Sequence, residues 1–414
     1  MSQVHSHWRR AIALVDMNAF FASVEQLDFP ELKGQPVGVT NGKQGTCIIT
    51  CSYEARAYGI KTGMRLREAK NLCPHIIQCP ARPSRYAELS TRIMQALFDI
   101  TPDLEIFSVD EAFLDLTHCQ KLYGGSPINI AKMAKDKVFE ASGLACSVGL
   151  SGDKTTAKYA AKLKKPDGFQ VILPWEAKER LKNVPVTELC GIAQGIGRFL
   201  GQYGVYTCGD MERLPISILS KRFGNIGRRI WYMCQGADPE PIITHIPDPK
   251  SIGHGKVIPP NTTDKSTLLT YFLHMSEKVG RRLRRHDMQA QHFFIGLRAG
   301  DYGWIGCKER LATPTNDGQL IYRLCRQMLN LCWSGQPGFQ VQVTALDPKP
   351  SVLQIDMFDN ENTKRTKINT SMDQVNERYG EFVVTPARLL KRSTMPNVIA
   401  PAWKPFGHRE TIAT

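Results

Sequence analysis

The stretch IALVDM, residues 12–17, is a short apolar run that stops at a carboxylate, Asp16. A second stretch, IFSVDEAFLDL at residues 106–116, places two adjacent carboxylates, Asp110 and Glu111, inside an otherwise apolar hairpin. Apolar runs of this length indicate buried strands, and a charge inside a strand pair is costly to bury without a compensating partner. A solvent-exposed turn would explain either stretch alone. Together they predict a carboxylate cluster built from adjacent strands.

A carboxylate cluster of this kind is typical of a metal site. Hard divalent ions such as Mg²⁺ prefer oxygen ligands and would neutralise the crowded charges. Two such ions about 3.5–4 Å apart are the usual device for in-line displacement at phosphorus. The two stretches therefore favour phosphoryl-transfer chemistry.

Length and composition are those of a folded protein with several domains: 414 residues, 42% hydrophobic and 22% charged. No apolar run is long enough to span a membrane, and the run at residues 11–15 is too short for a signal peptide, so we expect a cytoplasmic protein. The twelve cysteines are scattered, and only Cys47 and Cys51 lie close together. Reduced structural thiols are therefore expected, and not a zinc site.

The charge balance favours a polyanionic partner. Lys plus Arg number 53 and Asp plus Glu 39, which gives a net charge of +14 and a pI near 9.2. Residues 250–349 alone hold fourteen basic and seven acidic side chains. Nucleic acid is the commonest partner of such a protein.

The first third of the chain alternates short apolar strands with helical stretches, which is typical of an α+β or α/β domain within a multidomain protein. Strands are expected at residues 11–15, 37–39, 46–50, 106–109, 112–116 and 145–150, and helices at 20–26, 66–71, 85–98 and 128–141. Residues 175–240 indicate short helices broken by glycine, and the segment 241–260, rich in Pro and Gly, indicates a linker. A helical stripe at 269–283 and strands near 292–298 and 339–346 follow. From there to about residue 378 the polar composition predicts low order.

Four motifs give the sequence a family resemblance. Residues 15–25 and 108–115 resemble the two metal-binding motifs of the Y-family translesion DNA polymerases, in particular the DinB type, also called DNA polymerase IV. Residues 52–61 (SYEARAYGIK) are similar to that family's fingers motif, and residues 164–168 (KKPDG) to its lysine loop. The resemblance runs from about residue 10 to residue 350.

The resemblance implies roles for individual residues. Asp16, Asp110, Glu111 and the Met17 carbonyl would hold two Mg²⁺ ions, for which Mn²⁺ can substitute. The triphosphate of the incoming deoxynucleotide would be bound by Tyr53, Arg56 and Lys165, with Thr50 as a further contact. Phe21 would be the steric gate that excludes a 2′-hydroxyl, with its neighbour Phe20 in the core. Asp115 is expected to be structural.

The resemblance also implies an architecture. It predicts a right hand with a ferredoxin-like palm, small fingers, a helical thumb and an α/β little finger. The expected boundaries are 1–19 and 83–172 for the palm, 20–82 for the fingers, 173–240 for the thumb, 241–251 for a linker, 252–347 for the little finger and 348–414 for a tail. Short fingers imply low fidelity and tolerance of damaged templates, and no acidic constellation indicates a proofreading site.

Further contacts with primer–template DNA are expected outside the palm. Residues 188–193 occupy the place of a helix-hairpin-helix turn, from whose usual sequence Cys190 and Ala193 depart. A basic cluster on the predicted helix at 269–283 and just beyond it would contact phosphates without reading sequence. Its members are Lys278, Arg281, Arg282, Arg284 and Arg285.

The tail contains a candidate partner motif. Gln354, Ile355, Met357 and Phe358 match the pattern of the peptide that binds a bacterial-type sliding clamp. Residues 373–414 resemble the C-terminal extensions of UmuC-like relatives, and no function is assigned to them. The protein is expected to be a nucleoid-associated monomer.

Other functions are considered alongside the polymerase. A nucleotidyl cyclase would lack the motif at residues 52–61 and the basic third domain. A clamp-associated accessory protein that is inactive or weakly active would lose the acidic residues, which this chain keeps. A non-enzymatic DNA-binding module would explain the charge but not the carboxylates. Primer extension discriminates among these alternatives.

Overall fold

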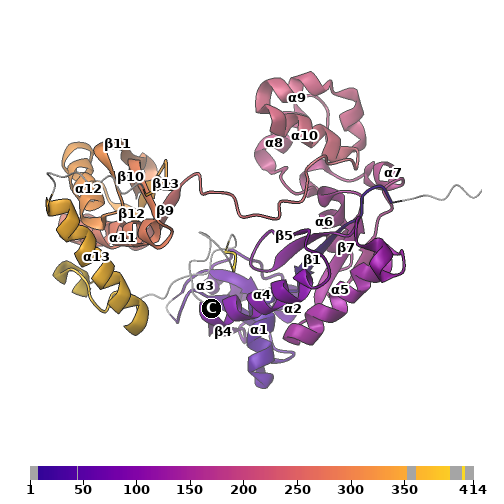
Figure 1. Cartoon of the computed structure of the whole chain (residues 1–414), viewed down its shortest axis with the longest axis horizontal. Coiled ribbons are helices and arrows are strands. Elements are labelled where there is room, and N and C mark those ends of the chain that lie inside the picture. The colour runs from indigo at the N-terminus through magenta and orange to yellow at the C-terminus, as the bar shows by residue number, and fades with distance from the viewer. Residues whose placement is uncertain (1–7, 44, 352–359, 392–402, 406–414) are drawn as a thin grey trace, which may run out of the picture. The chain divides into compact units, whose positions relative to one another are not determined.

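A computed structural model describes residues 8–43, 45–351, 360–391 and 403–405. The chain forms two compact units, and Figure 1 shows the elements of each. The first unit contains residues 1–246 and 395–414, and the second contains residues 247–394.

A five-stranded sheet is the centre of the first unit, with the strand order β5-β6-β1-β7-β8. Its strands are β1 (Ile12–Met17), β5 (Leu104–Ile106), β6 (Glu111–Asp115), β7 (Cys146–Ser151) and β8 (Phe169–Val171). β1 is central and runs antiparallel to both β6 and β7. Because side chains alternate along a strand, β1 supplies two different apolar clusters.

Helices cover both faces of this sheet. The main cluster takes Ala13 and Val15 of β1 together with apolar residues of α4 (Pro83–Phe98) and α5 (Pro127–Ser142). The opposite face takes Ile12 and Leu14, which pack with Ala157 and Ala161 of α6 (Lys154–Leu163). The sheet with α4 and α5 behind it is the palm that the sequence predicts. The helix α6 was not predicted.

A smaller sheet of order β3-β2-β4 forms the fingers. Its strands are β2 (Val37–Thr40), β3 (Ile48–Cys51) and β4 (Ile77–Pro80), accompanied by α1 (Phe20–Asp28), α2 (Tyr53–Ala57) and α3 (Leu66–Leu72). The region beyond residue 173 is helical, with α7 (Ala177–Leu181), α8 (Gln194–Gly201), α9 (Ile216–Phe223) and α10 (Asn225–Cys234) around one apolar cluster. Short 3-10 helices occupy Pro30–Leu32, Gln120–Tyr123, Val186–Glu188 and Gly209–Arg213.

The second unit is a four-stranded sheet of order β11-β10-β12-β9, packed against two helices. The elements are β9 (Ile252–Thr262), α11 (Lys265–Arg285), β10 (Met288–Ala299), β11 (Gly303–Thr315), α12 (Gly318–Cys332) and β12 (Gly338–Ala345). A two-residue strand, β13 (Lys349–Pro350), pairs with β10, and a 3-10 turn covers Gly300–Tyr302. This is the α/β layer structure expected of a little finger.

The predicted linker at residues 241–260 extends too far. β9 begins at Ile252 and pairs with β12 along most of its length. It is an edge strand, and an edge strand tolerates Pro259 and Pro260 because a proline there leaves no ladder bond unmade. Of the residues that indicated a linker, Gly253, Gly255, Pro259 and Pro260 are therefore part of a strand.

The prediction of low order after residue 346 is wrong for the part of the tail that the structure describes. Helix α13 (Asn360–Tyr379) and a 3-10 turn (Ala387–Lys391) pack on the second unit, as Figure 1 shows for α13 beside α11. Asp373 accepts two hydrogen bonds from the Arg284 guanidinium, at 2.6 and 2.9 Å. Ile368, Met372 and Val375 recur at helical spacing, but the segment around them is so polar that this apolar signal is weak, and the composition indicated low order instead.

The same contacts correct the interpretation of the basic cluster on α11. Lys278 is buried and pairs with Glu381 at 3.4 Å, and Arg284 is held by Asp373. Arg282 donates to the Gly253 carbonyl at 2.9 Å. These three cations stabilise the second unit internally, and they are not the open phosphate-binding row that the sequence indicated.

Two other features bear on the expectations from sequence. No helix in the described ranges is long and apolar enough to cross a membrane. All twelve cysteines are free, and most are buried, as expected for structural thiols.

Candidate active site

The three predicted carboxylates meet at one end of the palm strands. Asp16 is directly opposite Glu111 in the β1–β6 ladder, and Asp110 lies in the turn that precedes β6. The turn is fastened to β1 because the Met17 amide donates to the Asp110 carbonyl at 2.9 Å. Like charges directly opposite each other destabilise a strand pair, so this arrangement requires cations nearby.

Two lysines supply positive charge in the present structure. The Lys165 ammonium lies 2.5 Å from Asp16 Oδ1. Lys158 Nζ donates to both Glu111 oxygens, at 2.6 and 2.7 Å. Asp110 Oδ1 accepts a 2.6 Å hydrogen bond from the Ser108 hydroxyl. Each carboxylate therefore has its own partner.

Burial of these carboxylates destabilises their charged forms. Burial raises the pKa of Asp16 to about 7; Lys165 opposes this shift and the neighbouring Glu111 charge adds to it. Burial likewise raises the pKa of Asp110, against the hydrogen bond from Ser108. Shifts of this kind mark sites where charge is held for a function.

The donor set fits hard divalent ions. Three half-buried carboxylates supply oxygen ligands at one strand edge, which is the chemistry that Mg²⁺ prefers. In their present positions the side chains turn to Lys158, Lys165 and Ser108, and the described residues form no closed cluster of three metal ligands. A bound ion would replace the Lys165 contact with Asp16 as the compensating charge, while Lys158 would still orient Glu111 as a ligand.

Lys158 is the residue of this site that the sequence interpretation missed. It lies on α6, whose N-terminus is capped by Asp153, and its ammonium also lies 4.5 Å from the centre of the Phe107 ring. Lys154, one turn earlier, reaches Glu105 of the neighbouring strand at 2.7 Å. Two features of the sequence could have indicated this helix and its lysines. One is the capping residue Asp153, and the other is the four-residue spacing of Lys154 and Lys158, which places them on one helical face.

The fingers place an aromatic and a cation beside the carboxylates. Tyr53 is the first residue of α2. Burial raises the pKa of its hydroxyl, and the nearby Asp16 charge adds to this rise, whereas the Arg56 charge opposes it. Its hydroxyl is buried and makes no hydrogen bond of ordinary geometry within the described residues. The Arg56 guanidinium lies 4.7 Å from the centre of the Tyr53 ring. Thr50 is half-buried in β3, opposite Val39.

Phe21 lies on α1 as a half-exposed ring with a rigid support. It stacks on Tyr86 of α4 with a centroid distance of 4.3 Å and an interplanar angle of 16°. The Tyr86 hydroxyl donates to buried Glu25 at 2.6 Å, and Arg82 donates to the same carboxylate. Phe20 is in the core, as expected. The Tyr86 support could not be predicted, because it depends on a contact between helices that are distant in the chain.

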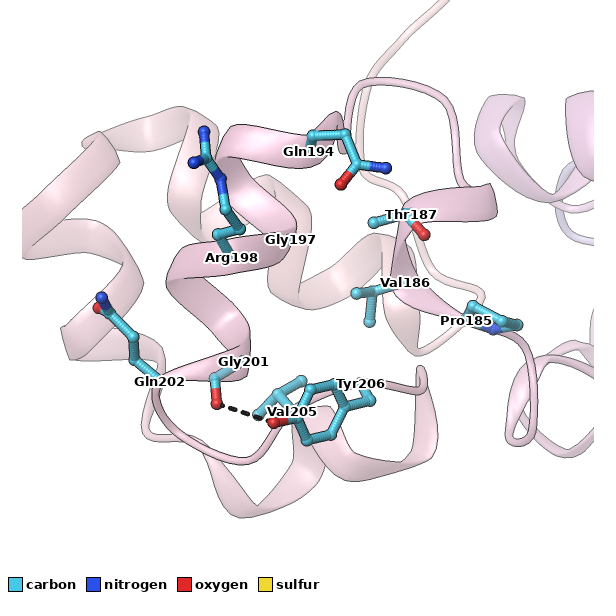
Figure 2. A pocket seen from close by; sticks show the side chains of 10 residues that line it. All are labelled: Pro185, Val186, Thr187, Gln194, Gly197, Arg198, Gly201, Gln202, Val205 and Tyr206. Carbon is cyan, nitrogen blue, oxygen red and sulfur yellow. Dashed lines mark hydrogen bonds between the residues drawn. The ribbon is translucent and has the colours of Figure 1, made fainter.

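The segment predicted as a helix-hairpin-helix turn connects the 3-10 helix Val186–Glu188 to α8. Gly191 has φ +93°, a conformation that favours glycine, and α8 begins immediately after Ala193. A pocket of about 570 Å³ lies between α8 and the segments around Pro185 and Tyr206; Figure 2 shows Gln194, Arg198 and Gln202 along α8. None of its lining residues belongs to the carboxylate site.

The proposed clamp-binding residues, Gln354, Ile355, Met357 and Phe358, lie outside the described residues.

Comparison with known proteins identifies the family. Residues 15–162 match the impB/mucB/samB family, and residues 249–357 match the C-terminal domain of the same family. A DNA polymerase IV of Moorella thermoacetica is 36% identical over 382 residues, which cover 90% of this chain and 94% of that protein. DNA polymerase IV 2 of Bacillus subtilis is 30% identical and covers 92% of this chain and 95% of that protein.

A solved structure agrees with these relatives. A Y-family DNA polymerase chimera matches with a TM-score of 0.72 and 25% identity, covering 82% of this chain and 100% of that one. The predicted fold class, an α+β polymerase with palm, fingers, thumb and little finger, is thereby confirmed. With its paired carboxylates on the palm sheet and its matches to both domains, the chain belongs to the impB/mucB/samB family of Y-family DNA polymerases, among relatives of the DNA polymerase IV type.

Proposed function

We propose that this chain adds deoxynucleotides to a primer 3′-end by two-metal-ion phosphoryl transfer at Asp16, Asp110 and Glu111. As a member of its family the chain is a translesion DNA polymerase, which acts on primer–template DNA and deoxynucleoside triphosphates. Its relatives support a requirement for metal, and two Mg²⁺ ions, replaceable by Mn²⁺, fit the oxygen donors. When bound, the ions would activate the primer hydroxyl and stabilise the leaving pyrophosphate.

One observation supports this assignment above the others. Asp16 and Glu111 are opposite each other on neighbouring strands. The backbone carbonyl of Asp110 accepts a hydrogen bond from the Met17 amide, next to Asp16. Strands β1 and β6, together with the turn before β6, thus place three carboxylates at one end of the palm sheet. The Met17 carbonyl lies at the same end of β1. The sheet fixes their spacing before any ion binds.

The chain's own residues would hold the nucleotide around this centre. The buried Tyr53 hydroxyl makes no hydrogen bond of ordinary geometry within the described residues and could donate to a phosphate oxygen, and Arg56 beside it offers paired donors that suit a phosphate. Lys165 would exchange its contact with Asp16 for the triphosphate once a metal neutralises the carboxylate. Thr50 would add a hydroxyl contact, and Phe21 would lie under the sugar.

Primer extension tests the proposed function. The purified protein is incubated with a labelled primer–template, the four deoxynucleotides and Mg²⁺, with parallel reactions in EDTA and on a template with an abasic site. Extension that needs Mg²⁺ and continues past the abasic site is expected. A preparation that is folded but extends neither template would contradict the proposal.

Replacing Lys158 by Ala should lower the single-turnover rate about 10-fold, because residues that orient a metal ligand commonly contribute 10–100-fold. Lys158→Arg keeps the charge beside Glu111 and should retain most of the rate. The readout is the Mg²⁺ concentration for half-maximal rate, which should rise in Lys158→Ala. The control is Lys162→Ala on the same helix, whose exposed side chain pairs with Glu188. Equal Mg²⁺ dependence in all variants would refute this role.

We also propose that the chain has the domain boundaries that its sequence predicts. The palm would comprise residues 1–19 and 83–172, the fingers 20–82, the thumb 173–240 and the little finger 252–347, joined by the linker 241–251. The thumb turn at Gly191 would approach a phosphate of the duplex. We also propose a nucleoid-associated monomer.

The peptide at residues 354–358 is proposed to bind a bacterial-type sliding clamp. Replacing both Gln354 and Phe358 by Ala removes the polar anchor and an apolar side chain of the motif. Clamp binding measured by surface plasmon resonance should fall at least about 10-fold, because a peptide motif depends on a few anchor residues. Extension without clamp should remain at the wild-type rate. Undiminished clamp binding by the double variant would exclude this peptide as the docking site.

A further inference from the structure

Two residues of the tail, Trp403 and Pro405, are buried in the first unit, far along the chain from the palm. Trp403 is 1% exposed and belongs to the main apolar cluster of the palm, which includes Leu97 and Leu104. Pro405 is also buried. A tryptophan is seldom enclosed completely, and burying its large surface is strongly favourable. We call residues 403–405 the C-terminal anchor.

The anchor lies beside the segment that leaves the palm for the second unit. Lys404 lines a pocket of about 300 Å³ together with Phe98 and Ile106 of the palm and with residues 243–246 of the linker. That segment is itself fastened to the palm, because the Ile243 amide donates to Glu105 Oε2 at 2.8 Å. Both chain connections between the units thus attach at the palm's edge strand, β5.

Before the C-terminal anchor, the tail also packs on the second unit. Leu389 of the last 3-10 turn is buried, and Arg388 donates to the Ser266 carbonyl at 3.3 Å. About a dozen residues separate this turn from Trp403, and such a length of chain spans at most about 40 Å. The second unit is therefore connected covalently to the first at its beginning and again at its end.

We propose that the C-terminal anchor is a second attachment that limits how far the little finger can move from the palm. A domain held by one linker can swing about a single point. A second connection restricts it to positions that both chains can reach, which raises its effective concentration near the palm. The anchor should therefore favour binding of primer–template DNA, which the proposed function requires the two units to hold together.

The first test uses full-length Trp403→Ala, with Leu390→Ala as control. Leu390 lies in the same tail, but it is 77% exposed. In Trp403→Ala, amide hydrogens of residues 242–246 should exchange faster, and the Kd for primer–template should rise roughly threefold to tenfold. Single-turnover insertion at saturating DNA should stay at the wild-type rate. Exchange and Kd equal to those of the wild type would overturn the proposal.

A second test separates the attachment from local packing. A protease site inserted between Met395 and Pro396 lets the folded protein be cut, with the uncut protein as control. After cutting, residues 242–246 should stay protected because Trp403 remains buried, while the Kd should rise as in Trp403→Ala. Cut protein that binds DNA as tightly as uncut protein would refute the tether. Insertion by the wild type reports separately on the proposed polymerase function.

Discussion

Asp110→Asn should abolish primer extension while leaving the fold intact. Asparagine has the shape of aspartate but lacks its charge, so the site loses a metal ligand at the point where negative charge develops on the transferred phosphate. Removing one such electrostatic group lowers rates about 10²–10³-fold, and loss of a bound metal adds to that. A decrease of roughly 10³-fold in the single-turnover rate is expected at saturating Mg²⁺.

The strand that follows Asp110 offers a matched control. Asp115 ends β6, and its Oδ1 accepts a 2.9 Å hydrogen bond from the Thr117 amide. It is an acidic residue with a turn-forming contact, so Asp115→Asn should extend primers at nearly the wild-type rate. If Asp110→Asn retained substantial activity, or if both variants lost it equally, the assignment of the metal ligands would be wrong.

Phe21→Ala should change which sugar the enzyme accepts. A 2′-hydroxyl placed against a ring that cannot move is an overpacking problem, and overpacking commonly costs about 1–3 kcal/mol. Removing the ring should therefore lower the preference for deoxyribonucleotides over ribonucleotides by up to about 100-fold. The ratio of kcat/KM for matched dNTP and rNTP on the same template measures the effect.

The support behind Phe21 makes this prediction specific. Because Tyr86 stacks on the ring and is held by Glu25, the ring cannot easily retreat. Phe21→Tyr keeps the bulk and should keep the discrimination. Unchanged sugar preference in Phe21→Ala, with polymerisation intact, would show that another side chain forms the gate.

Most of the palm could be predicted from sequence because its strands are short apolar runs with clear ends. The expected strand at residues 106–109 was displaced: β5 ends at Ile106, and the following residues form the turn that presents Asp110. The carboxylates were recognisable since each interrupts an apolar run. Their partner Lys158 was not, because a lysine on a helix ordinarily faces solvent and only the packing of α6 on the sheet directs it to Glu111.

Other elements escaped prediction for different reasons. β9 contains prolines that only an edge strand accommodates, and nothing in its own sequence shows that it lies at an edge. Helix α13 depends on ion pairs with residues almost a hundred positions away, such as Arg284 with Asp373. By contrast, α12 carries apolar residues at helical spacing, among them Ile321, Leu324 and Met328, and could have been predicted.

The carboxylates of the palm can be tested as a metal centre by crystallising the protein with a primer–template, a non-hydrolysable deoxynucleotide and Mn²⁺. Anomalous scattering locates the ions independently of how the side chains are built. Two manganese peaks about 3.5–4 Å apart, bound by Asp16, Asp110 and Glu111, are expected. Peaks elsewhere, or Asp16 still paired with Lys165 while the nucleotide is bound, would contradict the two-metal mechanism proposed for this chain.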